Sequence, residues 1–360
     1  MKTRRIASLP AVLLLLGGAS IAFGQIPMST PQDAGPGVQS GRDAREKAIL
    51  PLCKQPPPPP RPFPGGAEGG PAPLLPYSYT VKAIPGVIAA GARWQLLWVA
   101  NGNNADGILG QPDGSILIAQ NDRSDVVKLT DTGHASVVYR DTDTGGALFE
   151  SKNSTLYIGE RSLVASIWEL APQRKLFADR LQDGDPLDCT GGGLNDFVVT
   201  ANGGAYISAG AIYYANPQGV ITPQGHGLVF TDGIALSPDE HTLYVTDNVK
   251  GTLIAFDVQS DGSLVNQRVI AKMPGGGGDG STVDSQGRVY VTGYHGVRVF
   301  EPSGRYLGTI PAPYDLISSA FAGADKKTLF VVALVRGPGG LIDEIWTIPT
   351  IAQGYLGRAK

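Results

Sequence analysis

The stretch GIALSPDEHTLYVTD, residues 233–247, joins a Ser-Pro-Asp turn to an apolar strand centred on Tyr244. Close variants occur at 107–119 (GILGQPDGSILIA) and at 280–292 (GSTVDSQGRVYVT), with looser copies at 148–159, 197–208 and 321–332. The six strand centres are therefore 38 to 49 residues apart. A repeat of this length, with several short strands in each copy, is typical of a β-propeller. Six copies predict an all-β fold with six blades.

The first 24 residues have the composition of a secretory signal peptide. Basic residues at positions 2, 4 and 5 precede an apolar run over 11–16, and Ala22-Phe23-Gly24 provides a small-x-small cleavage site. The apolar run is too short and interrupted to span a membrane, and no Cys stands at the cleavage point to carry a lipid anchor. We therefore expect an exported protein, periplasmic or extracellular, with no membrane span in the mature chain.

A segment of low complexity, 25–77, separates the signal peptide from the repeats. Its proline run at 56–60 favours extended polyproline II structure. We interpret the segment as a tether, with a ligand for a proline-binding partner as the alternative. The propeller is then expected over 78–350, with 78–99 supplying the outer strand that closes the last blade and 351–360 forming a C-terminal tail.

The charge of the chain argues against nucleic acid as a partner. Removal of 1–24 takes away three basic residues and no acidic one, which moves the formal charge from −3 to −6. A mildly acidic chain with scattered basic residues lacks the electrostatic footprint of a nucleic-acid-binding protein. A propeller of this length buries its own core, so we expect a monomer.

The chain has two cysteines, Cys53 in the predicted tail and Cys189 ahead of a glycine run. An exported protein permits a disulfide between them, which would pin the tail to the propeller, but the sequence leaves their pairing open. Two cysteines and four histidines do not form a Cys/His zinc pattern.

Oxygen-bearing side chains precede four of the repeated strands. Because the innermost strand of each blade lines the central channel, residues just before these strands meet at one mouth. They are Asp106, Asn195, Asp232 and Asp279, while the second and sixth blades offer Gly145 or Gly146 and Ser318 or Ser319. A single Asp-Gly pair is ordinary turn chemistry, but its recurrence in register favours a site. Converging carboxylates need a cation, and hard oxygen ligands favour Ca²⁺ or Mg²⁺, with Mn²⁺ and Zn²⁺ as alternatives.

Four stretches resemble the senescence-marker-protein/gluconolactonase family, which includes regucalcin. They are GGLNDFVV (192–199), FTDGIALSPDEHTLYV (230–245), GDGSTVDSQGRVYV (278–291) and GVRVFEPSGRYLGTIPAP (296–313). The resemblance implies a six-bladed propeller that holds one divalent cation, usually calcium, in its channel and hydrolyses lactones or related esters.

The resemblance also assigns residues to roles. The family holds its cation with a Glu, two Asn and an Asp, and these positions correspond to Asp106, Asn195, Asp232 and Asp279. Asp106 is one methylene shorter than Glu, and Asp232 adds a negative charge where the family has an amide. Asp279 is the implied catalytic carboxylate, which activates water or attacks directly, with metal-bound hydroxide as the alternative nucleophile.

Substrate contacts are less well defined. Gly193 stands where sugar lactonases of the family carry an Arg that reaches the substrate. Glu160 and Arg161 resemble a Cys-Glu-His segment of the family and are candidates for substrate binding, with Arg161 as a replacement for the missing donor. His295 follows an inner strand and is a candidate acid or base near neutral pH, with an ordinary structural or rim histidine as the alternative.

The main functional hypothesis is an exported, metal-dependent hydrolase of a small-molecule lactone or related ester. The alternative is a non-catalytic exported propeller that binds a ligand or protein and keeps a structural cation. A third hypothesis is a lyase or sensor propeller, in which His295 or His226 would supply the imidazole. The chain contains neither a Gly-x-Ser-x-Gly motif nor a phosphate-binding loop of the Walker type.

Overall fold

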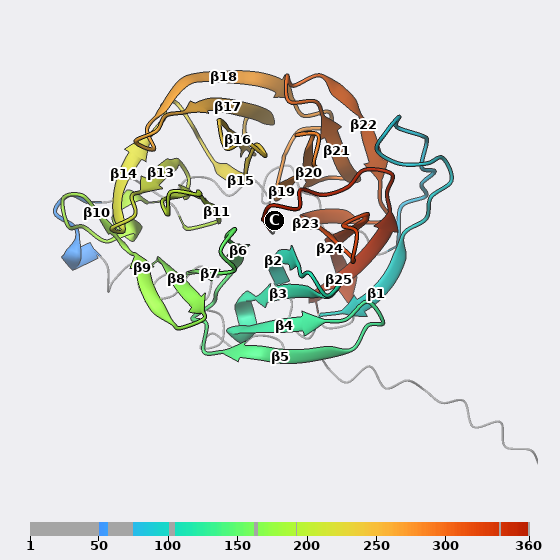
Figure 1. The fold of residues 1–360 in the computed structure, drawn as a ribbon, viewed down its shortest axis with the longest axis horizontal. Coiled ribbons are helices and arrows are strands. Elements are labelled where there is room, and N and C mark those ends of the chain that lie inside the picture. Colours follow the sequence, from blue (N-terminus) through green and yellow to red (C-terminus); the bar gives the residue numbers. More distant parts are fainter. Residues whose placement is uncertain are drawn as a thin grey trace, which may run out of the picture.

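A computed structural model describes residues 50–56, 75–100, 105–161, 165–191, 193–337 and 340–358. Six sheets surround a central axis, so the protein is an all-β, six-bladed propeller, as predicted (Figure 1). The predicted signal peptide and most of the predicted tail lie outside the described residues. Within the described part of the chain, no helix has the length and apolar character needed to cross a membrane.

Each blade contains four strands ordered from the axis outward, and the third has an additional outer strand. Blades one to three consist of β2 (Ala105–Gly110), β3 (Ile116–Gln120), β4 (Asp125–Leu129) and β5 (Ala135–Arg140); β6 (Ala147–Glu150), β7 (Leu156–Glu160), β8 (Ser166–Ala171) and β9 (Lys175–Ala178); and β11 (Asp196–Val199), β12 (Ala205–Ser208), β13 (Ile212–Ala215), β14 (Val220–Gln224) and the added β10 (Arg180–Leu181). Three short 3₁₀ segments, η1 (Leu50–Leu52), η3 (Asn121–Arg123) and η4 (Leu187–Thr190), lie outside the sheets.

Blades four to six repeat this order, and the sixth closes the ring. They consist of β15 (Thr231–Leu236), β16 (Thr242–Asp247), β17 (Thr252–Val258) and β18 (Leu264–Lys272); β19 (Ser281–Val283), β20 (Val289–Gly293), β21 (Gly296–Phe300) and β22 (Tyr306–Pro311); and β23 (Asp315–Ala322), β24 (Thr328–Gly337), β25 (Gly340–Pro349) and β1 (Gln95–Val99). The antiparallel pairing of β1 with β25 confirms that the segment 78–99 supplies the outer strand of the last blade. The ring is thereby held by strands from opposite ends of the fold.

The core lies between the blades, where neighbouring sheets pack face to face. Inner and second strands such as β15 and β3 are buried at every residue, whereas the outer strand β5 alternates between half-buried and exposed positions. Apolar runs therefore mark the strands near the axis, and alternation marks those at the rim. This packing holds the inner strands rigidly around the channel.

The last described residues return to the axis, and the C-terminal end of the trace lies at the centre of the ring (Figure 1). Gly354 forms a β-bridge with Asp284 of the fifth blade, and Ala352 and Arg358 are buried. The segment predicted as a tail therefore packs across the blades along its described length, 351–358.

Candidate metal and active site

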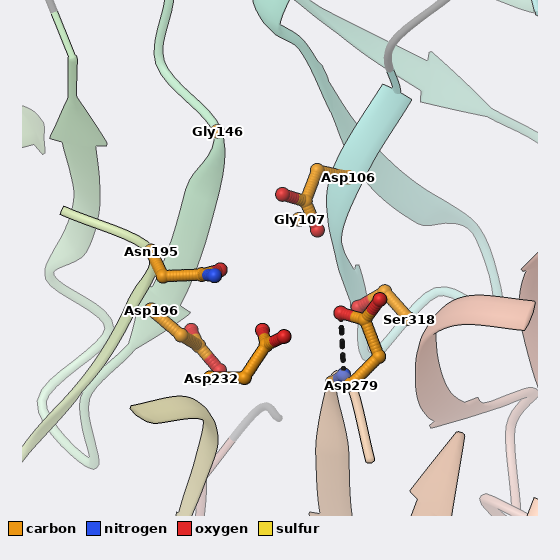
Figure 2. Close-up of a pocket in the computed structure, with 9 residues that line it drawn as sticks. Asp106, Gly107, Gly146, Asn195, Asp196, Asp232, Asp279 and Ser318 are labelled. Carbon is orange, nitrogen blue, oxygen red and sulfur yellow. Dashed lines mark hydrogen bonds between the residues drawn. The ribbon is translucent and has the colours of Figure 1, made fainter. Parts of the chain in front are cut away.

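The residues that precede the inner strands meet at one end of the channel, as the repeated blade topology requires. There they line a small cavity (Figure 2). The lining residues are Asp106, Gly107, Gly146, Asn195, Asp196, Asp232, Asp279, Gly280 and Ser318. The structure thus brings the four proposed metal ligands together, and it selects Gly146 and Ser318 as the lining residues of the second and sixth blades.

Two of the three Asp-Gly pairs at this mouth lie within inner strands and not in turns, whereas Asp279-Gly280 directly precedes β19. The register with the neighbouring strand shifts at Asp106-Gly107 in β2 and at Asp232-Gly233 in β15, so both dipeptides occupy β-bulges. A Cβ at Gly233 would lie 2.2 Å from the backbone oxygen of Asp279 on the next blade. Glycine is therefore required for the close approach of two blades, while the bulge changes the direction of the preceding carboxylate.

The carboxyl group of the buried Asp232 lies close to that of the half-buried Asp279. Burial, together with repulsion from Asp106, raises the pKa of Asp232 to about 7, although Asn248 Nδ2 donates a hydrogen bond to its Oδ2 at 3.0 Å. Burial also raises the pKa of Asp279 well above its usual range, and repulsion from Asp232 and Asp106 adds to this. The hydrogen bond that Gly280 N–H donates to Asp279 Oδ1 at 3.0 Å opposes the rise only in part (Figure 2).

The donor set fits a hard divalent cation. Carboxylate, amide and hydroxyl oxygens are the ligands that Ca²⁺ and Mg²⁺ prefer, and the cavity lining contains neither His nor Cys. Carboxylates buried this close together are all ionised only when a positive charge lies among them. In the described part of the chain, however, no three carboxylate, imidazole or thiol groups already have the spacing of a metal site.

Arg161 provides one positive charge at the mouth. Its Nη2 donates to Asp106 Oδ2 at 2.9 Å and to the backbone oxygen of Asn195 at 3.0 Å, and its Nε donates to the backbone oxygen of Leu194 at 2.8 Å. The side chain extends from the end of β7 across Gly146, where a Cβ would lie 2.6 Å from the guanidinium carbon. The second blade thus links the ligand positions of the first and third blades.

None of the three candidate substrate contacts is among the residues that line the cavity, although Arg161 bonds to two that are, Asp106 and Asn195. Glu160 is buried and accepts a hydrogen bond from Arg174 Nη2 at 2.7 Å. The side chain of His295 is 67% exposed and its ring packs edge-on against Tyr77, with 4.3 Å between ring centroids. Its backbone N–H donates to Asp315 Oδ1 at 2.9 Å, which fixes the turn and leaves the imidazole at the surface.

Cys53 and Cys189 form a disulfide, with 5.6 Å between their Cα atoms. Cys189 lies in η4, six residues before Asn195. Lys54 N–H also donates to Asp185 Oδ2 at 2.9 Å. The described part of the N-terminal segment is therefore fixed to the loop that leads into the site.

Three site residues were missed in the sequence. Asp196 lines the cavity and could have been found from its place next to Asn195. Asn248 contacts Asp232 from the end of the hairpin, a pairing that no spacing signals. Asn121 is wholly buried beside Gly146, and its amide atoms have no hydrogen-bond partner among the described residues.

Comparison with known proteins agrees with this architecture. Residues 112–334 match the family model "SMP-30/Gluconolactonase/LRE-like region". The chain belongs to this family. Among family relatives, a gluconolactonase from Zymomonas mobilis is 25% identical over 281 residues, covering 69% of this chain and 78% of that protein.

Two solved structures show the same fold. A gluconolactonase from Xanthomonas campestris has a TM-score of 0.61 and 22% identity, with coverage of 78% of this family member and 98% of that chain. A calcium-binding protein, regucalcin, from Agrobacterium tumefaciens has a TM-score of 0.55 and 19% identity, with coverage of 78% and 98%. The family predicted from the sequence is confirmed.

Proposed function

We propose that this family member is an exported hydrolase of a lactone or related ester that depends on a divalent cation. The observation that carries the proposal is the convergence of Asp106, Asn195, Asp232 and Asp279 on one buried cavity. The gluconolactonase names of relatives support a lactone as the substrate class.

Asn195, Asp232 and Asp279 would hold the cation, with Asp106 as the fourth oxygen ligand. Ca²⁺ is favoured by the hard donor set, and the description of one structural neighbour as a calcium-binding protein supports this choice. When bound, such a cation polarises a carbonyl oxygen as a Lewis acid. Asn248 fixes the carboxyl group of Asp232 through the hydrogen bond to its Oδ2.

Asp279 is the proposed proton acceptor. Its Oδ1 is held by the Gly280 N–H, which fixes the carboxyl group at the cavity wall. With a cation bound, Asp279 would be ionised, and its carboxylate would lie at the cavity wall where it can take a proton from attacking water. Water oxygen bonds to the carbonyl carbon, the ring C–O bond breaks, and Asp279 returns the proton to the leaving oxygen, which yields a hydroxy acid.

A metal titration of the full chain tests this proposal. Ca²⁺, Mg²⁺, Mn²⁺ or Zn²⁺ is added to chelated protein while thermal unfolding and the hydrolysis of a panel of lactones and esters are followed. Asp279→Ala and Asn195→Ala are the test variants, and Asp239→Asn, at an exposed turn outside the cavity, is the matched control.

Metal-dependent turnover that both test variants lose, and the control keeps, would support the proposal. Stabilisation by a cation without turnover of any lactone or ester would favour the non-catalytic binding propeller. A chain that binds no cation would contradict both the ligand assignment and the proposed chemistry.

A further inference from the structure

The second blade contributes a guanidinium group to the mouth in place of an oxygen ligand. Its lining residue is Gly146, and a Cβ there would lie 2.6 Å from Arg161 Cζ and 2.6 Å from Asn121 Oδ1. Any larger residue at 146 would occupy the space that the guanidinium uses. The glycine therefore admits Arg161 to the ring of ligand positions.

The Arg161 guanidinium is held in place, but not all of its N–H groups are hydrogen-bonded. Nη2 and Nε together make three hydrogen bonds, to Asp106, Asn195 and Leu194, and they fix the plane of the group. Among the described residues no acceptor bonds Nη1, and the side chain is 16% exposed. A guanidinium is always charged and has five N–H donors, so a charged donor remains at this mouth.

The chain next to one of its acceptors leaves open space. A Cβ at Gly193, just before Leu194, would meet no atom within 4 Å. The donor is thus held against the lining residues Asp106 and Asn195, beside a segment whose side-chain space is empty at Gly193. A donor held by three contacts loses little freedom when it binds a ligand oxygen, which favours orientation of a substrate.

We propose that Arg161 is the substrate-orienting residue of the site, with Nη1 donating a hydrogen bond to an oxygen substituent of the lactone ring. This inference rests on the proposed function. Asp106 would then both bind the cation and, through its Oδ2, position the guanidinium that contacts the substrate. Discrimination between a lactone with a hydroxyl or carboxylate substituent and a plain alkyl lactone would follow from this one contact.

The test compares wild type with Arg161→Gln and Arg161→Lys at saturating calcium. Arg268→Gln is the matched control, because Arg268 also pairs with an aspartate, Asp257, at 2.7 Å but lies at an exposed rim strand. Three readouts are needed: kcat and KM on a hydroxylated and an alkyl lactone, calcium affinity by calorimetry, and calorimetric binding of the ring-opened hydroxy acid.

We expect Arg161→Gln to raise KM for the hydroxylated lactone about 10- to 100-fold, the range of a lost charged hydrogen bond. KM for the alkyl lactone should rise much less, because this substrate lacks the substituent, whereas loss of the contacts to Asp106, Asn195 and Leu194 affects both lactones alike. Arg161→Lys should recover part of the loss, and Arg268→Gln should match wild type. Equal losses on both lactones together with weaker calcium binding would overturn the inference, because Arg161 would then only organise the ligands. Unchanged kinetics would overturn it as well.

Hydroxy-acid binding separates this inference from the proposed function. If wild type opens no lactone, the proposed function fails, and the binding of the ring-opened acid decides the role of Arg161. Weaker binding of the acid by Arg161→Gln would support the inference, and equal binding by both proteins would overturn it.

Discussion

The two ends of the central channel are built from the same six inner strands but have opposite chemistry. Where these strands begin, buried carboxyl groups face one another, and burial and repulsion raise the pKa of Asp232 and Asp279. At the far ends of these strands is a second cavity, of about 180 Å³. It is lined by Phe149, Val198, Ile234, Ala235, Leu236, Val283 and Arg358.

The single charge at the second end is matched by the protein itself. The Arg358 side chain is 3% exposed, and its Nη2 donates to the backbone oxygens of Leu236 and Ser237. Lys326 Nζ in turn donates to the backbone oxygen of Arg358 at 2.9 Å. Arg358 Nη1 also lies 3.6 Å from Glu240 Oε1, so this charge has an opposite charge within the fold, whereas the carboxyl groups at the mouth repel one another, which marks a site for a ligand. We therefore expect substitutions at the mouth to affect function and substitutions at the second end to affect stability.

The largest effect is expected for Asp279→Asn at the mouth. Loss of the proton acceptor should lower kcat/KM for a lactone by about 10³-fold. Thermal unfolding of the chelated protein should occur at the same or a higher temperature, because one buried carboxyl group that repels its neighbours is removed. Steady-state kinetics and melting curves measure both quantities. A loss of less than tenfold in kcat/KM, or a large loss of stability, would break the distinction between the two ends.

Arg358→Met tests the second end. Removal of a buried guanidinium leaves the strand-end oxygens of Leu236 and Ser237 without donors, and we expect a loss of about 3 kcal/mol in the free energy of unfolding. Calcium affinity should not change. Urea denaturation and calorimetry provide the two measurements, with the exposed Lys327→Met as a control for loss of a nearby positive charge. A variant as stable as wild type would contradict the stabilising role of Arg358. Weaker calcium binding would show that the two ends of the channel are not independent.

Much of this contrast could be predicted from the sequence. The repeat places Asp106, Asn195, Asp232 and Asp279 before matching strands, and a propeller has only one arrangement in which such positions meet. The closing strand was predictable for the same reason, because the sixth blade lacks one strand in its own repeat. Periodicity thus determined both the fold and the ring of oxygen donors.

The contacts that modify this ring were not predictable. Arg161 reaches Asp106 across 55 residues of sequence, and Arg358 reaches Leu236 across 122. Such contacts depend on how neighbouring blades approach and not on any period in the chain. The role of Gly233 was likewise hidden, since Asp-Gly is a turn signal in the sequence but a bulge against the next blade in the structure.

The pH dependence of stability sharpens the contrast further. Because the folded-state pKa of Asp232 is raised to about 7, the folded protein keeps a proton that the unfolded chain loses above its ordinary pKa of 3.8. Stability of the chelated protein should therefore fall as pH rises between about 4 and 7, by several degrees in Tm. Saturating calcium should reduce this fall, because the cation stabilises the ionised carboxylates at the mouth, while Glu160 and Asp343, whose pKa values burial also raises, keep the remainder.

Melting curves from pH 4 to pH 8, with chelator or with calcium, measure this effect. Asp232→Asn should make the curve of the chelated protein less steep, with the remaining slope due in part to Asp279, while Asp239→Asn, at an exposed turn, should leave it unchanged. A melting temperature that rises through this window in the presence of chelator would contradict the assigned pKa shift.

The smallest effects concern two glycines at the mouth. Gly193→Ala should change the free energy of unfolding by less than about 0.5 kcal/mol, because its Cβ would meet no atom within 4 Å. Gly146→Ala places a methyl group 2.6 Å from the Arg161 guanidinium and should displace it, with a measurable loss of kcat/KM at unchanged calcium affinity. The pair adds the same methyl group at a position that lines the cavity, Gly146, and at one that does not, Gly193, so a difference in kinetics reports the effect of displacing the guanidinium. Equal kinetics for the two variants would mean that the position of the guanidinium has no influence on the reaction, and the mouth would then act through its carboxylates alone.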